Sequence, residues 1–277
     1  MEKIAAFLII IRPINTLIGI LSIFIGAFIT GTIRPFEKIL LACVSGGLIQ
    51  GGANSINDYF DLEIDRINKP HRPLPAGKLG RGEVFVFSMI FFGGGVVCGA
   101  MVNRIALGIV SCSAILLFTY SARLKGSILW GNFVVSLVTG LAFIYGGIAV
   151  NRFHESLIPA GFSFLFHFGR EIIKDMQDIE GDRANRIVTF AIRCGQRMSL
   201  GLITVIYSLL IFSTLLPYFY DIYGIGYFIV VLIGVDAVVV GCLISMWRNP
   251  ESKNLGRISN ILKADMLIGL LAIYLGR

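Results

Sequence analysis

The chain has 277 residues, of which 56% are hydrophobic and only 15% are charged, and its mean hydropathy is +0.81. Apolar runs of about 20 residues, the length that spans a bilayer as a helix, recur along the whole sequence. This composition excludes an ordinary soluble domain and predicts an all-α, polytopic membrane bundle. The net charge is +7. Its basic residues lie in short segments between the apolar runs, and the sequence contains no nucleic-acid-binding motif, so we expect no nucleic-acid partner.

Nine apolar segments are expected to form transmembrane helices within a single domain, residues 1–277. Several are short, so the sequence predicts eight or nine spans. In chain order they are residues 14–33, 38–57, 83–102, 105–121, 128–150, 157–175, 199–217, 225–247 and 259–276. Glycine recurs inside them, for example at Gly93-Gly94-Gly95, and small residues favour close packing of helices in membranes.

The basic residues divide unequally between the two ends of these segments. One side receives the N-terminus and the connections after the second, fourth, sixth and eighth segments, and it holds most of the 24 Lys and Arg residues. The other side holds only Arg34, Lys38, Arg104, Arg152 and Arg277. The positive-inside rule predicts that the basic side is cytoplasmic, where it would also attract anionic membrane lipid.

Two acidic patterns with identical spacing follow directly on the second and sixth segments, and both fall on the basic side. They are Asn57 with Asp58, Asp61 and Asp65, and Asp175 with Asp178 and Asp182. A carboxylate within hydrocarbon costs about 2.5–3.5 kcal/mol on insertion scales, so two matched sets indicate a functional site. On a helix, positions i, i+3 and i+7 fall within an arc of about 60°, which predicts that each set points one way.

The residue types of these sets favour a magnesium and phosphate site. Mg²⁺ prefers a few carboxylates together with substrate phosphate, and no neighbouring His or Cys suggests zinc. Six aspartates and a diphosphate leave excess negative charge even with two Mg²⁺ ions, so the site needs protein cations. Nearby segments supply Arg66, Lys69, Arg72, Arg183 and Arg186, and more distant ones supply Arg12, Arg123 and Lys125. Glu171 is expected to form an ion pair with a neighbouring Arg or Lys.

The run NDYFDLEIDRINKPHRPLPAG and the run REIIKDMQDIEGD resemble the two motifs of the UbiA superfamily of intramembrane prenyltransferases. The segment from Tyr120 to Lys125 resembles the tyrosine-and-lysine loop between these motifs, and Arg12-Pro13 with Asn15 resembles the start of the first helix. The resemblance implies about nine helices around a central cavity, with Mg²⁺ and a polyprenyl diphosphate at its cytoplasmic mouth.

The same resemblance implies roles for individual residues. Asp61, Asp178, Lys125 and Tyr120 would be catalytic. The diphosphate would be bound by Arg12, Asn15, Arg66, Lys69, Arg72, Arg123 and Lys125, and the metal by Asn57, Asp58, Asp61, Asp65, Asp175, Asp178 and Asp182.

Within the superfamily, the run GREIIKD and the Arg72-Pro73 tail of the first motif look most like archaeal-type digeranylgeranylglyceryl phosphate synthases. Those enzymes transfer a geranylgeranyl group from its diphosphate to a lipophilic acceptor, geranylgeranylglyceryl phosphate. This chain reads Thr189-Phe190-Ala191 where such sequences often read Thr-Leu-Pro. The alternatives are an aromatic acceptor, as in quinone or chlorophyll biosynthesis, and a cation-coupled transporter, which would place its acids near mid-membrane on broken helices.

Overall fold

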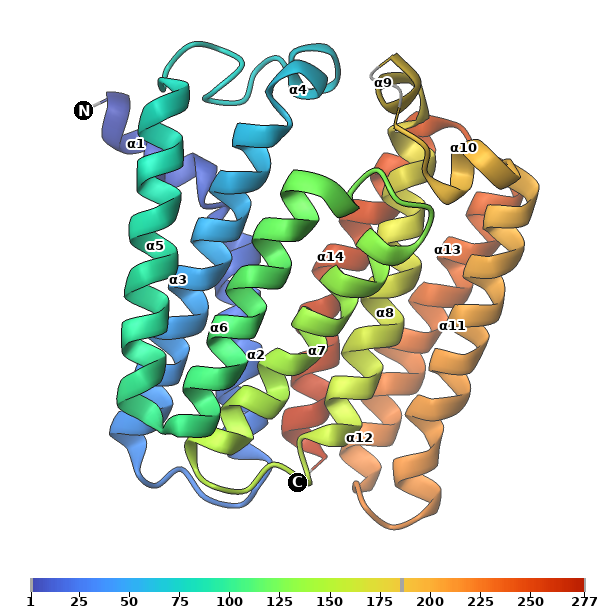
Figure 1. Ribbon diagram of the computed structural model, residues 1–277. Coiled ribbons are helices and arrows are strands. Elements are labelled where there is room, and N and C mark those ends of the chain that lie inside the picture. Colours follow the sequence, from blue (N-terminus) through green and yellow to red (C-terminus); the bar gives the residue numbers. More distant parts are fainter. Residues whose placement is uncertain (1, 185–186, 277) are drawn as a thin grey trace.

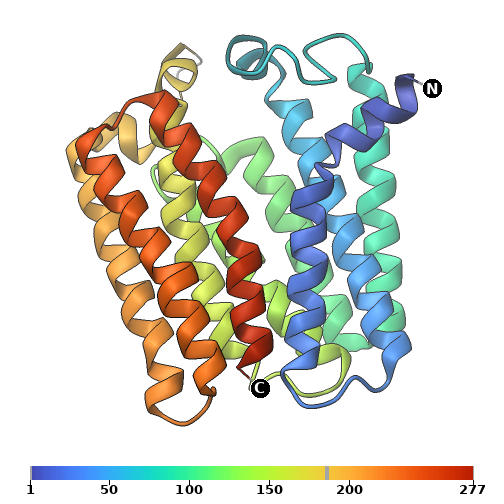
Figure 2. The ribbon, with the colours of Figure 1, turned by 180° about the vertical axis from the view of Figure 1, so that it is seen from behind.

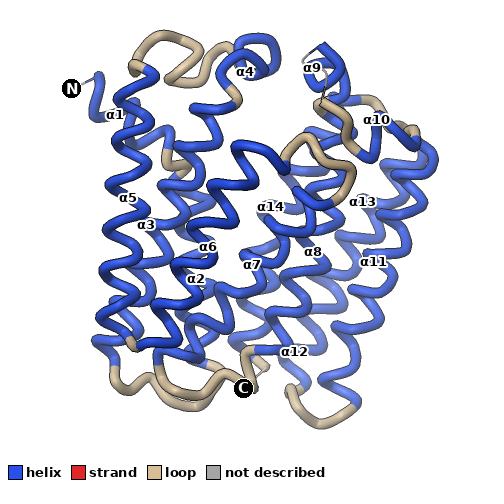
Figure 3. Tube along the Cα trace, in the orientation of Figure 1, coloured by secondary structure: helices blue, strands red, loops and turns tan. Residues whose placement is uncertain are grey.

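The computed structural model describes residues 2–184 and 187–276, which form helices joined by short loops (Figure 3). In chain order these are α1 (Glu2–Ile10), α2 (Pro13–Phe28), α3 (Phe36–Phe60), α4 (Leu62–Asn68), α5 (Arg81–Val102), α6 (Arg104–Thr119), the π-helical η1 (Tyr120–Leu124), α7 (Trp130–Ala149), α8 (Leu157–Gln177), α9 (Ile179–Ala184), α10 (Phe190–Cys194), α11 (Gln196–Phe219), α12 (Ile225–Val230), the π-helical η2 (Val231–Asp236), α13 (Ala237–Arg248) and α14 (Ser252–Leu275). The described residues contain no strand, as expected for an all-α protein.

Each of the nine predicted segments coincides with a helix. Among the described residues, seven helices are long and apolar enough to cross a membrane, and α1 with α2 makes an eighth if this pair, bent by 48°, is one span. The remaining segment, 157–175, corresponds to α8. This helix has 21 residues, but its second half carries Arg170, Glu171, Lys174 and Asp175. The chain is therefore an integral, multi-pass membrane protein.

The helices form two groups (Figure 1), and each group has its own apolar core. One core joins α2, α3, α5, α6 and α7 around Ile23, Ile56 and Tyr145. The other joins α8 and α10 to α14 around Ile173, Tyr207 and Met246. Figure 2 shows α2 and α14 at the junction of the two groups, where a third cluster, which includes Ile18 and Ile273, connects them.

The first group packs backbone against backbone where its glycines lie. A Cβ atom on Gly146 of α7 would lie 1.9 Å from the carbonyl oxygen of Ile23 in α2. Only glycine allows this approach, as in other membrane helix pairs with small residues at the contact.

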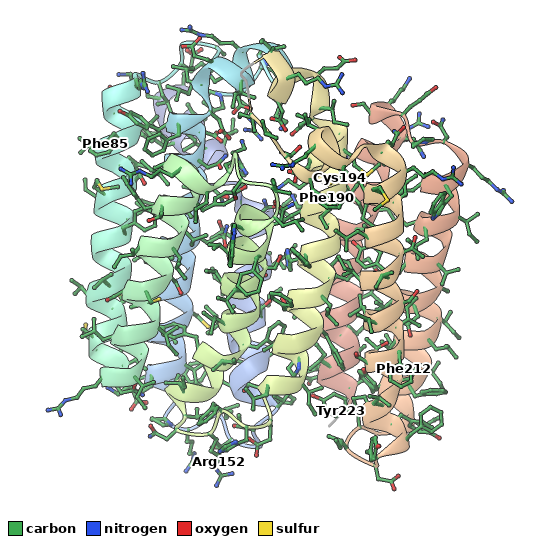
Figure 4. The ribbon with its side chains drawn as sticks, turned by 45° about the vertical axis from the view of Figure 1, so that its right-hand side comes forward. Phe85, Arg152, Phe190, Cys194, Phe212 and Tyr223 are labelled. Atoms are coloured by element: carbon green, nitrogen blue, oxygen red, sulfur yellow. The ribbon has the colours of Figure 1, made fainter. Side chains whose placement is uncertain are left out.

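All connections on the predicted cytoplasmic side gather at the end of the bundle that carries α4, α9 and the N-terminus (Figure 1). Arg152 lies at the opposite end (Figure 4). The two acidic sets therefore share one end of the molecule.

Candidate active site

Both acidic sets interrupt a helix at their middle aspartate. Asp61 separates α3 from α4, and Asp178 separates α8 from α9. Their φ and ψ angles are −84° and 4°, and −96° and 11°, in the sparsely allowed region between helix and strand. The expectation of one continuous helical face is therefore corrected by a break at each middle residue. Backbone bonds still continue through it, from Asp65 N to Asp61 O (2.7 Å) and from Asp182 N to Asp178 O (3.0 Å).

The two sets face each other across a short gap. Lys69, just after α4, lies 3.2 Å from Asp178 Oδ2, and α4 touches α9. A Cβ atom on Gly181 of α9 would lie 2.1 Å from Asn68 Nδ2 in α4, so α9 and the Asn68 side chain lie in close contact. A cation from the first motif thus reaches a carboxylate of the second, although more than 100 residues separate them in the chain.

Asp61 has two side-chain partners at this mouth. It is buried, accepts a hydrogen bond from Asn57 Nδ2 (2.6 Å), and pairs with Lys125. The π-helical turn η1, closed by the bond from Lys125 N to Tyr120 O, lets both Tyr120 and Lys125 line the cavity; π-turns are often found at functional sites. Burial alone would lower the pKa of Lys125. The negative charge of Asp61 outweighs this effect, so the pKa of Lys125 lies above its usual value.

Asp58 and Asp65 lie behind the cavity wall instead of on it. Both are 2% exposed. Arg72 lies 2.6 Å from Asp65 Oδ2 and 3.1 Å from Asp58 Oδ1, and Arg12 also pairs with Asp58. Arg12 and Arg72 do line the cavity, so these two carboxylates hold the guanidinium groups in place. Burial raises the pKa of Asp65 even though Arg72 opposes the shift.

Arg12 occupies the bend between α1 and α2 in the left-handed conformation, with φ of 52°. Proline at the first position of a helix is favourable, and it disfavours the right-handed helical conformation at the preceding residue. Pro13 therefore starts α2 and separates it from α1. Asn15, one turn later, lines the cavity, and its Oδ1 atom is buried without a hydrogen-bond partner among the described residues.

All three aspartates of the second set line the cavity. Asp175 accepts a hydrogen bond of 2.8 Å from Asn132 Nδ2 of α7. Burial raises the pKa of Asp182 to about 6; Lys125 lowers it, while Asp178 and Asp61 raise it further. A carboxylate with this pKa changes charge near neutral pH.

Below the polar mouth, the cavity continues as an apolar limb between the helix groups. It is lined by Ile18, Ile23, Ile49, Ile109, Val110, Leu117, Val135, Val138, Leu141 and Met266. Tyr145, near the end of α7 that is remote from the acidic sets, also lines it, and its hydroxyl donates to Ser45 Oγ (2.9 Å). The wall of α3 from Asp61 to Gly46 is about 22 Å long at the helical rise per residue, similar to an extended geranylgeranyl chain.

The sequence and fold match known proteins over nearly the whole chain. A model of the UbiA prenyltransferase family matches residues 19–261. The chain belongs to the UbiA prenyltransferase family. It is therefore an enzyme of prenyl transfer, and the transporter alternative is wrong.

Relatives and solved structures within this family agree with that assignment. The digeranylgeranylglyceryl phosphate synthase of Methanothermobacter thermautotrophicus is 36% identical, with 96% of this chain and 94% of the relative covered. That of Methanopyrus kandleri is 35% identical, with 96% and 97% covered. A solved structure of a digeranylgeranylglyceryl phosphate synthase superposes with a TM-score of 0.79 at 34% identity, covering 100% of this chain and 99% of that one. A UbiA homologue from Archaeoglobus fulgidus bound to GPP and Mg²⁺ shares the fold, with a TM-score of 0.73 at 17% identity over 97% of this chain and 99% of that one.

The UbiA-type mouth has donors suited to Mg²⁺, although they are not gathered into a closed metal cage. In the described part of the chain, no three His, Cys, Asp or Glu side chains lie close enough together to hold a metal ion. Asn57, Asp61, Asp175, Asp178 and Asp182 nevertheless line one cavity. Mg²⁺ typically uses one or two carboxylates and completes its shell with substrate phosphate and water, so this oxygen-only donor set fits the ion.

Two predicted diphosphate ligands lie away from this cavity. Arg66 pairs with Glu63 at 2.8 Å on the surface, and Arg123 is exposed. Neither lines the cavity wall. Arg183 is also exposed, and Arg186 lies outside the described residues. The remaining predicted cations, Arg12, Lys69, Arg72 and Lys125, all line the cavity.

The sequence reasoning missed three charged residues of the cavity wall, Arg170, Lys174 and Lys263. It also missed Asn132, which donates a hydrogen bond to Asp175. Each is a polar residue within or near an expected apolar span, and that is the signal that could have found them. The expected ion pair of Glu171 is confirmed, since Lys174 Nζ lies 2.8 Å from Glu171 Oε2.

Proposed function

We propose that this prenyltransferase transfers a geranylgeranyl group from its diphosphate to the free hydroxyl of geranylgeranylglyceryl phosphate, forming an ether of a membrane lipid. The observation that carries the proposal is the convergence of two acidic sets on the mouth of one apolar cavity. Relatives 32–36% identical over nearly full length, named digeranylgeranylglyceryl phosphate synthase, support this acceptor over an aromatic one. These relatives match the chain even though it reads Thr189-Phe190-Ala191 where such synthases often read Thr-Leu-Pro.

Mg²⁺ is the cofactor of this proposal. Asn57, Asp61, Asp175, Asp178 and Asp182 would hold it, and the bound ion would act as a Lewis acid on the leaving diphosphate. Asp58 and Asp65, with their Arg partners, are proposed to position Arg12 and Arg72 instead. Such positioning keeps two guanidinium groups directed at the mouth before substrate binds.

The protein's own residues then stabilise the charge that develops during transfer. As the allylic C–O bond breaks, negative charge grows on the diphosphate, and Arg12, Lys69, Arg72 and Lys125 offset it from the cavity wall. Tyr120 is proposed to contact the reacting groups beside Lys125. The apolar limb holds the prenyl chain and excludes water, which would otherwise capture the allylic cation. The acceptor oxygen bonds to the allylic carbon, and its proton is released.

The orientation and extent of the catalytic unit are part of the same proposal. The site end carries most of the Lys and Arg residues, so we place it in the cytoplasm by the positive-inside rule. Residues from α2 to α14 line the cavity. Because both helix groups contribute, we propose that residues 1–277 act as a single catalytic domain.

The test is a product assay with a panel of acceptors. The purified protein is incubated with geranylgeranyl diphosphate, Mg²⁺, and either geranylgeranylglyceryl phosphate or aromatic acids, and the products are read by mass spectrometry. Digeranylgeranylglyceryl phosphate is the expected product. Prenylated aromatic acid as the sole product would replace this acceptor with the aromatic alternative.

A further inference from the structure

A group of basic residues lines the cavity on the wall formed by α8 and α14. It consists of Arg170 and Lys174 on α8 and Lys263 on α14, and is called the basic wall below. Neither the acidic sets nor the roles proposed above involve these residues. They lie in helices of the membrane bundle, where an unneutralised charge is costly.

The contacts of the basic wall leave it short of negative charge. Arg170 Nε donates to the carbonyl oxygen of Ser259 at 3.2 Å, which joins α8 to α14. Glu171 lies 2.8 Å from Lys174 Nζ and 3.9 Å from Arg170 Nη1. Asp175, the residue after Lys174, also interacts with Lys174 electrostatically but is hydrogen-bonded to Asn132. Lys263 has no carboxylate partner among the described residues, and the charges that act on it most are those of Arg170 and Arg12, which repel it.

The charges on this wall define the ligand that would balance them. Three cations face two carboxylates, Glu171 and Asp175, so one positive charge on this wall is unbalanced, and Lys263 carries it without a carboxylate partner among the described residues. Arg12, whose charge also acts on Lys263, is already paired with Asp58. A phosphate monoester carries about −1.5 to −2 charges at neutral pH, so it would neutralise Lys263, and a second cation of the wall once Asp175 binds Mg²⁺. An uncharged acceptor would leave Lys263 unpaired in a partly buried site, and an aromatic carboxylate would bring only one negative charge.

We propose that the basic wall binds the phosphate monoester of the prenyl acceptor. This inference rests on the proposed function and names the recognition element for its acceptor. The Mg²⁺-bound diphosphate of the donor would occupy the acidic side of the mouth, and the acceptor phosphate the basic side. Separate anion sites in one cavity keep the acceptor phosphate from competing for the acidic sets, and they select acceptors that carry a phosphate.

The test separates the two phosphate-bearing substrates by steady-state kinetics of Lys263→Gln. Loss of one charge-assisted contact predicts a rise of about tenfold in KM for geranylgeranylglyceryl phosphate, with less than a twofold change in KM for geranylgeranyl diphosphate. The preference for this acceptor over unphosphorylated geranylgeranylglycerol should fall by the same factor. Lys263→Arg should retain most of the preference. Lys253→Gln, an equal charge change at an exposed position of the same helix, should behave as wild type.

A second measurement needs no variant. Glycerol 1-phosphate should inhibit the wild-type enzyme competitively against the acceptor and not against the donor. Equal effects of Lys263→Gln on both KM values, or on neither, would overturn the inference, as would inhibition competitive with the donor. In those cases transfer to geranylgeranylglyceryl phosphate would still stand. Failure of the wild type to use that acceptor would instead overturn the proposed function itself.

Discussion

Replacing Arg72 with Gln tests how the carboxylates behind the cavity wall are held. Arg72 lies 2.6 Å from Asp65 and 3.1 Å from Asp58. In the variant, Asp58 keeps Arg12 as its partner, whereas Asp65 loses its cation while only 2% exposed. Breaking a buried ion pair costs roughly 3–5 kcal/mol. Arg72 is 20% exposed, and Asp65 can take up a proton, so we expect a loss near the lower end, about 3 kcal/mol.

The expected loss depends on pH in a defined direction. Burial already raises the pKa of Asp65 above its usual value despite Arg72, and removing Arg72 raises it further. A carboxyl group whose pKa is higher in the folded state than in the unfolded state lowers the free energy of unfolding at a pH where it is ionised. This cost disappears when the pH is low enough to protonate it. The destabilisation should therefore be largest at pH 8 and should shrink as the pH falls through the folded pKa of Asp65.

Thermal unfolding in detergent measures both effects. At about 2–4 °C per kcal/mol, Arg72→Gln should lower Tm by at least about 6 °C at pH 8. The double variant Arg72→Gln/Asp65→Asn should recover at least half of the loss, because the unpaired charge is gone. Arg66→Gln removes an exposed ion pair and should change Tm by less than about 1 °C. An unchanged Tm for Arg72→Gln, or no recovery in the double variant, would refute this reasoning.

Three further predictions concern the metal, the pH dependence and the apolar limb. EDTA should stop prenyl transfer and Mg²⁺ should restore it, because oxygen donors alone face the diphosphate; full activity in metal-free buffer would exclude the metal role. Asp182, with a pKa of about 6, must lose its proton to bind Mg²⁺, so the Mg²⁺ concentration for half-maximal activity should rise as the pH falls from 7.5 to 5.5. A pH-independent Mg²⁺ requirement would contradict the role of Asp182. Tyr145→Ala, which shortens a side chain of the apolar limb, should let the enzyme use geranylfarnesyl diphosphate, whereas Phe143→Ala, equally buried on the same helix but not lining this cavity, should not. Product analysis by mass spectrometry decides, and an unaltered preference for geranylgeranyl diphosphate would exclude Tyr145 as the residue that limits chain length.

The hydrophobic pattern predicted the helices well because a bilayer imposes a strong length and polarity constraint on each span. All nine expected segments are helical, and the positions of the two acidic sets at one end followed from their places in the chain. Segment 157–175 falls short of a standard span because Arg170, Glu171, Lys174 and Asp175 belong to the cavity wall.

Spacing alone could not reveal which acids face the cavity. The periodicity placed Asp58, Asp61 and Asp65 on one helical face, but the chain turns at Asp61. Asp61 then contacts Lys125, while Asp58 and Asp65 contact Arg12 and Arg72. These pairings depend on residues brought together from distant parts of the chain, and a single sequence does not record such contacts. Lys263 stands out in the sequence as a charge inside an expected span, but its place in the cavity also depends on contacts between distant parts of the chain.

Both acidic sets together are proposed to bind one Mg²⁺-diphosphate group. The most direct measurement is the rise in Tm caused by geranylgeranyl diphosphate with Mg²⁺, because a ligand that binds only the folded protein stabilises it. Wild type and Glu63→Gln, a change of an exposed acid beside the first set, should both be stabilised. Asp61→Asn and Asp178→Asn should each lose most of that rise while remaining folded. Wild-type stabilisation in either aspartate variant would contradict the claim.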